Sequence, residues 1–278
     1  MTAGSMTSAV HSGGLDGSAL RLVAFDLDDT LARSKCAIEP DMARALIALL
    51  ARHAVLVISG GNTEQFRTQV LGQLPDDPVL DHLHLMPTCG TRYLRREEGA
   101  WTQVYAHDLD PAARDAAVAA LEQVAREIGC WEPDEVVHGE RIEDRGSQVT
   151  FSALGQQAPP DAKAAWDPDG SRREAMRSRL APLLPDLEVR AGGSTSVDVT
   201  SRGIDKAYGL GRLMELLDLR PEEVLFVGDR LEPGGNDHPV VGLGVGTRAV
   251  RHAGDTLEVI AGLLASTGVA ATGPVAAP

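Results

Sequence analysis

Cysteine is scarce in this sequence of 278 residues, with three residues in all. Cys36, Cys89 and Cys130 lie far apart, are odd in number and form no CxxC pair, so they signal neither a disulfide framework nor a zinc site. We expect them to be thiols of the core or the surface, in a protein of the reducing cytoplasm.

Long hydrophobic runs are also missing. No segment approaches the ~18 consecutive apolar residues of a membrane span. Residues 1–19 are small, polar and rich in Gly and Ser, without the charged and apolar regions of a signal peptide. We predict flexible tails at 1–19 and 266–278, no membrane association and a cytoplasmic location.

Positive charge is in the minority. The sequence has 26 Lys and Arg against 40 Asp and Glu, a net charge of −14 and a pI near 5.0. The acids are spread along the chain, which argues against nucleic acid or an anionic membrane as partner. An anionic small molecule would need a local positive site or a metal ion.

The apolar residues, 43% of the chain, follow an alternating strand and helix pattern. Short apolar runs at 20–25 and 54–58 predict buried strands, and apolar residues at helical spacing predict a helix at 40–52. A second helix is expected at 63–74, after the small residues that follow Ile58. Strand, helix and strand in this order are typical of a parallel sheet covered on both faces.

The same pattern returns late in the chain, with a helix predicted at 206–217 and a strand at 223–227. Between the two halves the pattern changes to amphipathic helices and strands of alternating polarity, which predicts an α+β insert. Helices are expected there at 111–128 and 171–184, and strands at 135–142, 147–152, 187–190 and 196–200. The predicted fold is a doubly wound, mainly parallel α/β sheet at 20–101 and 198–265, with an α+β cap at 102–197.

Polar clusters follow each of the three predicted core strands: DLDDT from Asp26, SGGN from Ser59 and GD at Asp229. Reactive groups collect at the carboxyl ends of parallel strands. Side chains two apart on an extended chain share a face, so Asp26 and Asp28 point the same way. These two carboxylates would repel Asp229 unless a hard cation lay between them, and oxygen ligands without thiolate suit Mg²⁺.

Each residue taken alone has an ordinary structural explanation. Asp26 and Asp28 could form a turn or helix cap, Ser59 could be an N-cap, and Lys206 could be a solvated helix residue. An EF-hand does not fit, because the sixth and twelfth positions from Asp26 are Leu31 and Ala37. The combination of clusters, in this order, favours function.

DLDDT, ISGG, the lysine of RGIDKAYGL and GDRLEPGGNDH together resemble the four motifs of the haloacid dehalogenase superfamily of phosphotransferases. The resemblance covers nearly the whole chain between the tails. It implies that Asp26 attacks phosphorus to form an aspartyl-phosphate, and that Asp28 transfers a proton to and from oxygen. Ser59 and the backbone at Gly60 would hold the phosphoryl oxygens, and Lys206 would add positive charge.

The resemblance also implies a Mg²⁺ site. Its ligands would be Asp26, the backbone carbonyl of Asp28 and Asp229, with Asn236 and Asp237 completing or orienting the shell.

The position and pattern of the insert resemble the large cap of the eukaryotic-type phosphomannomutases within this superfamily. PGGNDH after Asp229, GGSTSVD before Lys206 and IEDRG at residues 142–146 carry this narrower resemblance. It implies that Ser196 and Asp198 contact the sugar, and that Arg145 helps to clamp the phosphate that is not transferred. Without the resemblance, Arg145 would be a surface charge on a hairpin.

The sequence departs from that family at four positions. Gln156 and Lys163 stand where the family has further cap arginines; lysine keeps the charge but loses the bidentate fork, and glutamine loses the charge. Lys35 replaces an arginine near the nucleophile loop, and Asp29 replaces the glycine of DxDGT. We expect Lys35 and Lys163 still to bind substrate. A weaker clamp favours hydrolysis over return of a bisphosphate intermediate.

The sequence therefore predicts an Mg²⁺-dependent enzyme that acts on a sugar phosphate, with a phosphatase ahead of a phosphomannomutase. A binding protein that has lost turnover is a third interpretation. The presence of Asp26, Asp28, Lys206 and Asp229 disfavours it. A homodimer through the cap is possible by the same resemblance.

Overall fold

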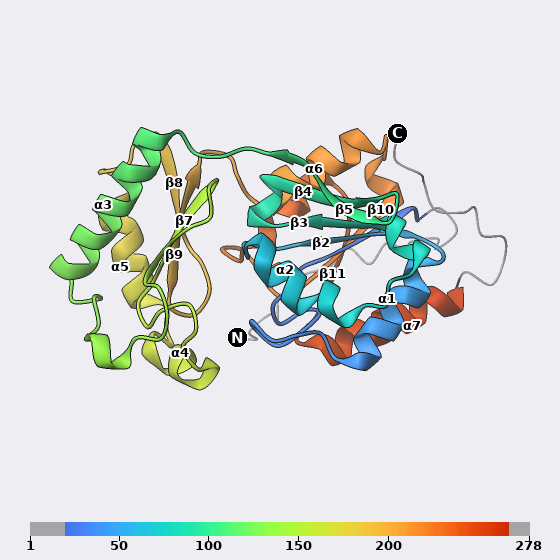
Figure 1. Cartoon of the computed structure of the whole chain (residues 1–278), viewed down its shortest axis with the longest axis horizontal. Coiled ribbons are helices and arrows are strands. Elements are labelled where there is room, and N and C mark those ends of the chain that lie inside the picture. The colour runs from blue at the N-terminus through green and yellow to red at the C-terminus, as the bar shows by residue number, and fades with distance from the viewer. Residues whose placement is uncertain (1–19, 267–278) are drawn as a thin grey trace, which may run out of the picture.

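The computed structural model describes residues 20–266, which form two lobes, each built on one β-sheet (Figure 1). The larger sheet holds β1 (Leu22–Phe25), β2 (Ala54–Ile58), β3 (Leu83–Met86), β4 (Arg92–Glu97), β5 (Ala100–Ala106), β10 (Val224–Gly228) and β11 (Gly246–Ala249). The smaller sheet holds β6 (Ile142–Asp144), β7 (Gln148–Ser152), β8 (Leu187–Ala191) and β9 (Ser196–Ser201). The helices are α1 (Pro40–Leu50), α2 (Thr63–Gln69), α3 (Pro111–Glu127), α4 (Pro160–Trp166), α5 (Ser171–Leu180), α6 (Lys206–Leu216) and α7 (Ala253–Ser266).

The larger sheet has the order β11-β10-β1-β2-β3-β4-β5, and its first five strands run parallel. Phe25, at the end of β1, is level with Val57 of β2 and Val227 of β10. The residues that follow these three strands therefore meet at one edge. This confirms the predicted doubly wound, mainly parallel sheet.

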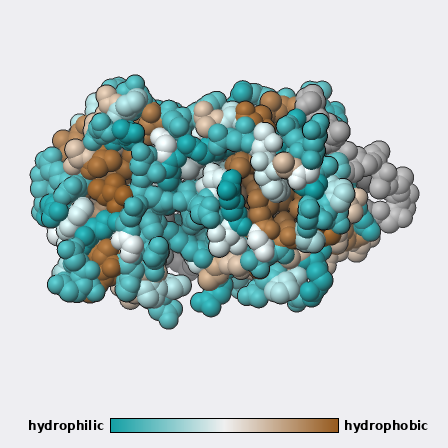
Figure 2. All heavy atoms as spheres, viewed as in Figure 1, coloured by the Kyte–Doolittle hydropathy of each residue, from teal (hydrophilic) through white to brown (hydrophobic). Residues whose placement is uncertain are grey.

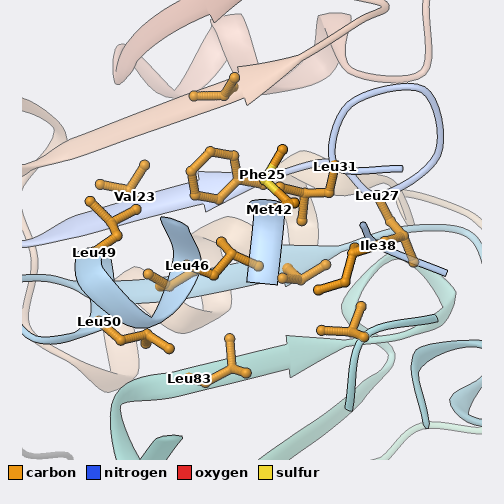
Figure 3. Packing of buried hydrophobic residues seen from close by; sticks show 14 of the residues in the cluster. Val23, Phe25, Leu27, Leu31, Ile38, Met42, Leu46, Leu49, Leu50 and Leu83 are labelled. Carbon is orange, nitrogen blue, oxygen red and sulfur yellow. The ribbon is translucent and has the colours of Figure 1, made fainter. Parts of the chain in front are cut away.

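Helices cover both faces of this sheet, which explains why its central strands are apolar throughout. Val23, Phe25 and their neighbours pack against α1 and α7, and Figure 3 shows Leu46 and Leu49 of α1 among these side chains. Leu22 and Ala24 pack on the opposite face, against α6. Buried side chains on both faces hold the strand ends in fixed positions.

The β4–β5 hairpin lies antiparallel at the edge of the larger sheet and was not predicted from the sequence. Its turn places Glu98 at φ 50° and Gly99 at φ 83°, as in the tight turns that match strand twist. The strands lack the apolar runs that marked the central strands, and their polar residues are Arg92, Arg95, Arg96, Glu97, Thr102 and Gln103.

The smaller sheet is antiparallel, with the order β6-β7-β9-β8. Val149, Val197 and Val199 face α3 and α5 and form a separate core. The other face carries polar side chains such as Gln148, Thr150 and Asp198, which line a cleft between the lobes. The insert therefore has one apolar and one polar sheet face.

One predicted strand of the insert is wrong. Residues 135–142 were expected to be extended, but Asp134–Val136 form a short 3₁₀ helix and the strand begins only at Ile142. Pro133 precedes this helix, and Gly139 turns the chain at φ 79°. The alternating polarity of this segment, which predicted a strand, therefore belongs to a folded loop.

The expected cap limits of 102 and 197 fall inside β5 and β9, of which β5 pairs in the larger sheet and β9 in the smaller. We propose that the cap runs from about residue 107 to 204. The expected tails lie outside the described residues, except Ser266, which ends α7.

Two expectations drawn from the missing features can be compared with the structure. Within residues 20–266, no helix is long and apolar enough to cross a bilayer. Cys36, Cys89 and Cys130 are free, respectively exposed, half-buried and buried, as expected of unpaired thiols.

Candidate active site

Three carboxylates meet at the carboxyl edge of the larger sheet. Asp26 follows β1, and its backbone N–H donates to the Val227 carbonyl of β10 at 3.0 Å. Asp229 follows β10, and Asp237 lies in the loop beyond it. One oxygen atom from each of these three aspartates lies within 4.8 Å of the others.

Lys206 is the positive counterpart of this cluster and is 1% exposed. Its Nζ donates to Oδ1 of Asp26 and to Oδ1 of Asp237, each at 2.5 Å. The side chain of Asp205 caps the start of α6 by accepting from the Tyr208 N–H, which fixes where Lys206 enters the site. The ammonium is thus held between Asp237 and Asp26, the nucleophile candidate.

Burial governs the proton affinities here. It raises the pKa of Asp26 well above its usual value, and Lys206 opposes that rise. Burial and Asp237 raise the pKa of Asp229 to about 6. Burial lowers the pKa of Lys206, but Asp26 and Asp237 outweigh it, so the net shift is upward and the ammonium stays charged. More negative charge is gathered here than one lysine balances.

The chemistry of the donors fits a hard cation. The cluster offers carboxylate oxygens only, as Mg²⁺ prefers. Both oxygens of Asp237 accept short hydrogen bonds, Oδ1 from Lys206 and Oδ2 from the Arg230 N–H at 3.0 Å, whereas Oδ2 of Asp26 accepts only a long bond from the Thr30 hydroxyl at 3.4 Å. This arrangement suits an orienting role for Asp237, with Asp26 and Asp229 available as direct ligands.

Asp28 lies outside the three-carboxylate cluster but lines the cleft. Its Oδ1 accepts from the backbone N–H of Lys35 at 2.6 Å and from Nε2 of Gln69 at 3.4 Å. These donors hold the carboxylate at the cleft, whose wall also includes Asp26, the nucleophile candidate two residues earlier in the chain. That position fits transfer of a proton to and from substrate oxygen.

Ser59 and Gly60 line the cleft where β2 ends. The Ser59 hydroxyl accepts from the Gly61 N–H at 3.2 Å, which tightens the loop. A side chain at Gly60 would meet nothing within 4 Å, so this backbone is open to a ligand. Hydroxyl and amide groups in such a loop suit phosphoryl oxygens.

The cleft between the lobes has a volume of about 810 Å³ and is lined from both sides. The surface is mainly hydrophilic between the lobes on the face drawn in Figure 2. The predicted site residues on its wall are Asp26, Asp28, Lys35, Ser59, Gly60, Arg145, Ser196, Asp198, Lys206, Asp229 and Asn236. Asp198 accepts from the Thr150 hydroxyl at 2.8 Å, and burial raises its pKa.

The three cations expected to bind substrate, Lys35, Arg145 and Lys163, gather around Gln156. Its Oε1 accepts from Nζ of Lys35 at 2.7 Å and from Nη2 of Arg145 at 3.4 Å. Its backbone carbonyl accepts from Nζ of Lys163 at 2.8 Å. Lys163 is not among the residues that line the cleft in the described part of the chain. All three cations therefore already have protein acceptors.

A parallel α/β sheet with a strand-end aspartate, a buried lysine and an acidic cluster under a cap is typical of phosphoryl-transfer enzymes. The family profile described as haloacid dehalogenase-like hydrolase matches residues 23–237. The chain belongs to this family, and it is an enzyme of the phosphatase or phosphomutase kind. Members of the family generally use Mg²⁺.

Curated relatives agree with the sequence resemblance to phosphomannomutases. The chain is 24% identical to a probable phosphomannomutase of Caenorhabditis elegans over 234 residues, 80% of this chain and 87% of the relative. It is also 24% identical to a phosphomannomutase of Drosophila melanogaster over 225 residues, 79% of this chain and 85% of the relative.

Two solved structures share the fold. An IMP-bound, N-terminally truncated IMP-nucleotidase of Plasmodium falciparum has a TM-score of 0.67 at 16% identity, over 88% of this chain and 68% of that one. A trehalose-6-phosphate phosphatase of Aspergillus fumigatus has a TM-score of 0.55 at 19% identity, over 94% of this chain and all of that one.

Three contributors to the site were missed from the sequence. Arg230 positions Asp237 through its backbone N–H, and Thr150 bonds Asp198. Glu143 accepts hydrogen bonds from the Arg145 guanidinium at 2.7 and 2.9 Å. A backbone donor leaves no sequence signal, but the alternation on β7 could have placed Thr150 on the polar face with Gln148.

We expect Asp229→Ala to raise the Mg²⁺ concentration needed for half-maximal activity by at least about tenfold, because one of few charged ligands is lost. The measurement is an activity titration with Mg²⁺, accompanied by the rise in melting temperature that Mg²⁺ causes. Glu232→Ala, in the same loop but exposed, serves as the control. Identical titrations for Asp229→Ala and wild type would remove Asp229 from the metal site.

Proposed function

We propose that this protein is an Mg²⁺-dependent phosphatase that hydrolyses a sugar monophosphate through an aspartyl-phosphate on Asp26. The observation that carries the proposal is the engagement of Lys35, Arg145 and Lys163 by protein acceptors around Gln156. A mutase must hold the second phosphate of a bisphosphate intermediate. Cations bound to protein acceptors would have to give up those bonds to hold it.

Each residue of the site has a step in this reaction. Asp26 attacks phosphorus, Asp28 gives a proton to the departing sugar oxygen and then takes one from the attacking water. Ser59, the Gly60 backbone and Lys206 hold the phosphoryl oxygens as charge develops. Bound Mg²⁺, held by Asp26, the Asp28 carbonyl and Asp229 with support from Asn236 and Asp237, would screen the charges of the nucleophile and phosphate.

The cap would select the sugar. Ser196 and Asp198 on β9 line the cleft opposite Asp26, and the Thr150 hydroxyl holds Asp198 in place. A carboxylate and a hydroxyl on one sheet face suit the hydroxyl groups of a sugar. Changes on this face should alter substrate choice more than the chemical step.

A phosphomannomutase is the second candidate, and the names of the curated relatives favour it. The two reactions differ in what accepts the phosphoryl group from Asp26. Water gives free phosphate, whereas a sugar monophosphate gives a bisphosphate, which returns its other phosphoryl group to Asp26 and leaves as the isomerised monophosphate.

We expect free phosphate to dominate when wild-type enzyme and Mg²⁺ are given mannose 1-phosphate or glucose 1-phosphate with a bisphosphate activator. Free phosphate and 6-phosphate sugar are measured in the same samples at low conversion. Gln156→Arg with Lys163→Arg should shift product toward the isomerised sugar, because bidentate forks strengthen contacts to the second phosphate. Almost pure isomerised sugar from the wild type would leave the mutase interpretation in place.

A further inference from the structure

Glu143 on β6 joins the cap to the core. It is 17% exposed, and its Oε2 accepts from Nε and Nη2 of Arg145 at 2.9 and 2.7 Å. Its Oε1 accepts from Nδ2 of Asn62, which belongs to the larger lobe. One carboxylate thus holds the cap arginine and reaches the loop that follows β2.

Asn62 is fixed on the side of the core. It is the N-cap of α2, where its Oδ1 accepts from the Gln65 N–H at 2.8 Å and its own N–H donates to Oε1 of Gln65 at 3.0 Å. The side-chain amide therefore has one atom committed to the helix and the other directed at Glu143. Asn62 cannot follow the cap without breaking the helix cap.

Arg145 completes the link. It is 6% exposed, and its Nη1 donates to the Gly60 carbonyl at 2.7 Å. The guanidinium is thus shared between Glu143 of the cap and the backbone of the loop that carries Ser59 and Gly60, which we call the phosphate loop. We call the contacts among Glu143, Arg145, Asn62 and the Gly60 carbonyl the Glu143 latch.

We propose that Glu143 is a positioning residue, which orients Arg145 and holds the cap closed over the site through Asn62. The latch joins the cap to the loop that carries Ser59 and Gly60, so closure of the cap and placement of the phosphate loop are coupled. Charge-assisted bonds between largely buried groups are stronger than an exposed ion pair. The proposal rests on the proposed function, since it gives the closed cap a role in binding a sugar phosphate.

Removal of the latch should weaken binding of a substrate that contacts the cap more than binding of one that does not. A sugar phosphate fills both the phosphate loop and the cap face, so it depends on closure. A p-nitrophenyl phosphate has no sugar for the cap residues to recognise. A residue with a merely structural role would change both substrates alike.

The chain offers a matched set of variants. Glu143→Gln keeps the size but loses the charge. Asn62→Asp keeps the N-cap acceptor for α2 but loses the donor and places a second carboxylate against Glu143. Combining Asn62→Asp with Glu143→Gln restores an amide-to-carboxylate bond in the opposite sense. Asn62→Ser keeps the cap of α2 and only removes the reach to Glu143.

The first measurement is amide hydrogen exchange of residues 59–65 without substrate, with circular dichroism as the check on folding. We expect exchange about tenfold faster in Glu143→Gln, Asn62→Asp and Asn62→Ser, because the loop loses its tie to the cap. Wild-type exchange in all three folded variants would overturn the latch. This result does not depend on the substrate assignment.

The second measurement compares KM and kcat for a hexose phosphate and for p-nitrophenyl phosphate. Glu143→Gln and Asn62→Asp should raise KM for the hexose phosphate about tenfold and lower kcat/KM for p-nitrophenyl phosphate by only about threefold, because both substrates use the loop at Ser59 and Gly60 but only the hexose phosphate also uses the cap face. The double variant, Asn62→Asp with Glu143→Gln, should reverse at least about half of the increase in KM for the hexose phosphate that Asn62→Asp causes alone. Equal effects on both substrates would contradict the proposal, and so would a double variant whose KM for the hexose phosphate is as high as that of Asn62→Asp. Failure to turn over any hexose phosphate would instead refute the proposed function and leave the exchange result intact.

Discussion

Asp26→Asn should reduce turnover to less than about a hundredth of wild type while the protein stays folded. The amide has nearly the shape of the carboxylate, but it cannot form an acyl-phosphate. Its Oδ1 can still accept from Lys206, so the buried ammonium keeps one bond here and its ion pair with Asp237. The measurement is kcat on p-nitrophenyl phosphate with saturating Mg²⁺, next to a thermal melt.

Asp29→Asn is the matched control. Asp29 is exposed and adopts φ 61°, a left-handed conformation that asparagine also tolerates. This variant should keep at least about a tenth of the activity, since Asp29 lies outside the three-carboxylate cluster. An Asp26→Asn enzyme as active as Asp29→Asn would rule out Asp26 as the nucleophile.

Lys206→Met should have the second largest effect. It removes the charge that Asp26 and Asp237 share, and kcat should fall about 10²- to 10³-fold, as when a preorganised charge is lost from a transition state. Stability should also fall, by about 3–5 kcal/mol without Mg²⁺, because buried carboxylates lose their partner. Added Mg²⁺ should restore part of the melting temperature by binding to the same carboxylates.

The sequence contains three lysines, so Lys163→Met is a close control for this experiment. Lys163 donates to the Gln156 carbonyl, and burial with the nearby Lys35 lowers its pKa to about 8. We expect kcat on p-nitrophenyl phosphate to stay within about threefold of wild type, because this substrate does not depend on the cap cations. Equal losses of kcat in both lysine variants would show that Lys206 has no special place in the reaction.

The central strands and the catalytic edge could be predicted because local patterns encode them. Apolar runs that end in Asp26, Ser59 and Asp229 marked buried parallel strands, and the geometry of a parallel sheet places their ends together. The position of Lys206 beside them came from resemblance to a family, since no local pattern says where a helix will dock.

The remaining features depend on contacts distant in sequence. The β4–β5 hairpin carries polar edge strands whose periodicity is weak, and residues 135–142 mimic an alternating strand in a loop held by Pro133 and Gly139. The contact between Glu143 and Asn62 joins residues 81 positions apart. Such contacts arise only when both lobes are folded and docked.

Trapping the phosphorylated enzyme tests the central claim most directly. Enzyme mixed with substrate and Mg²⁺ is quenched within one turnover and treated with borohydride, which reduces an acyl-phosphate to an alcohol. We predict that peptide mass spectrometry finds homoserine at position 26, and only in samples that contained substrate. Product formation without this modification, or with the modification on another aspartate, would contradict an aspartyl-phosphate on Asp26.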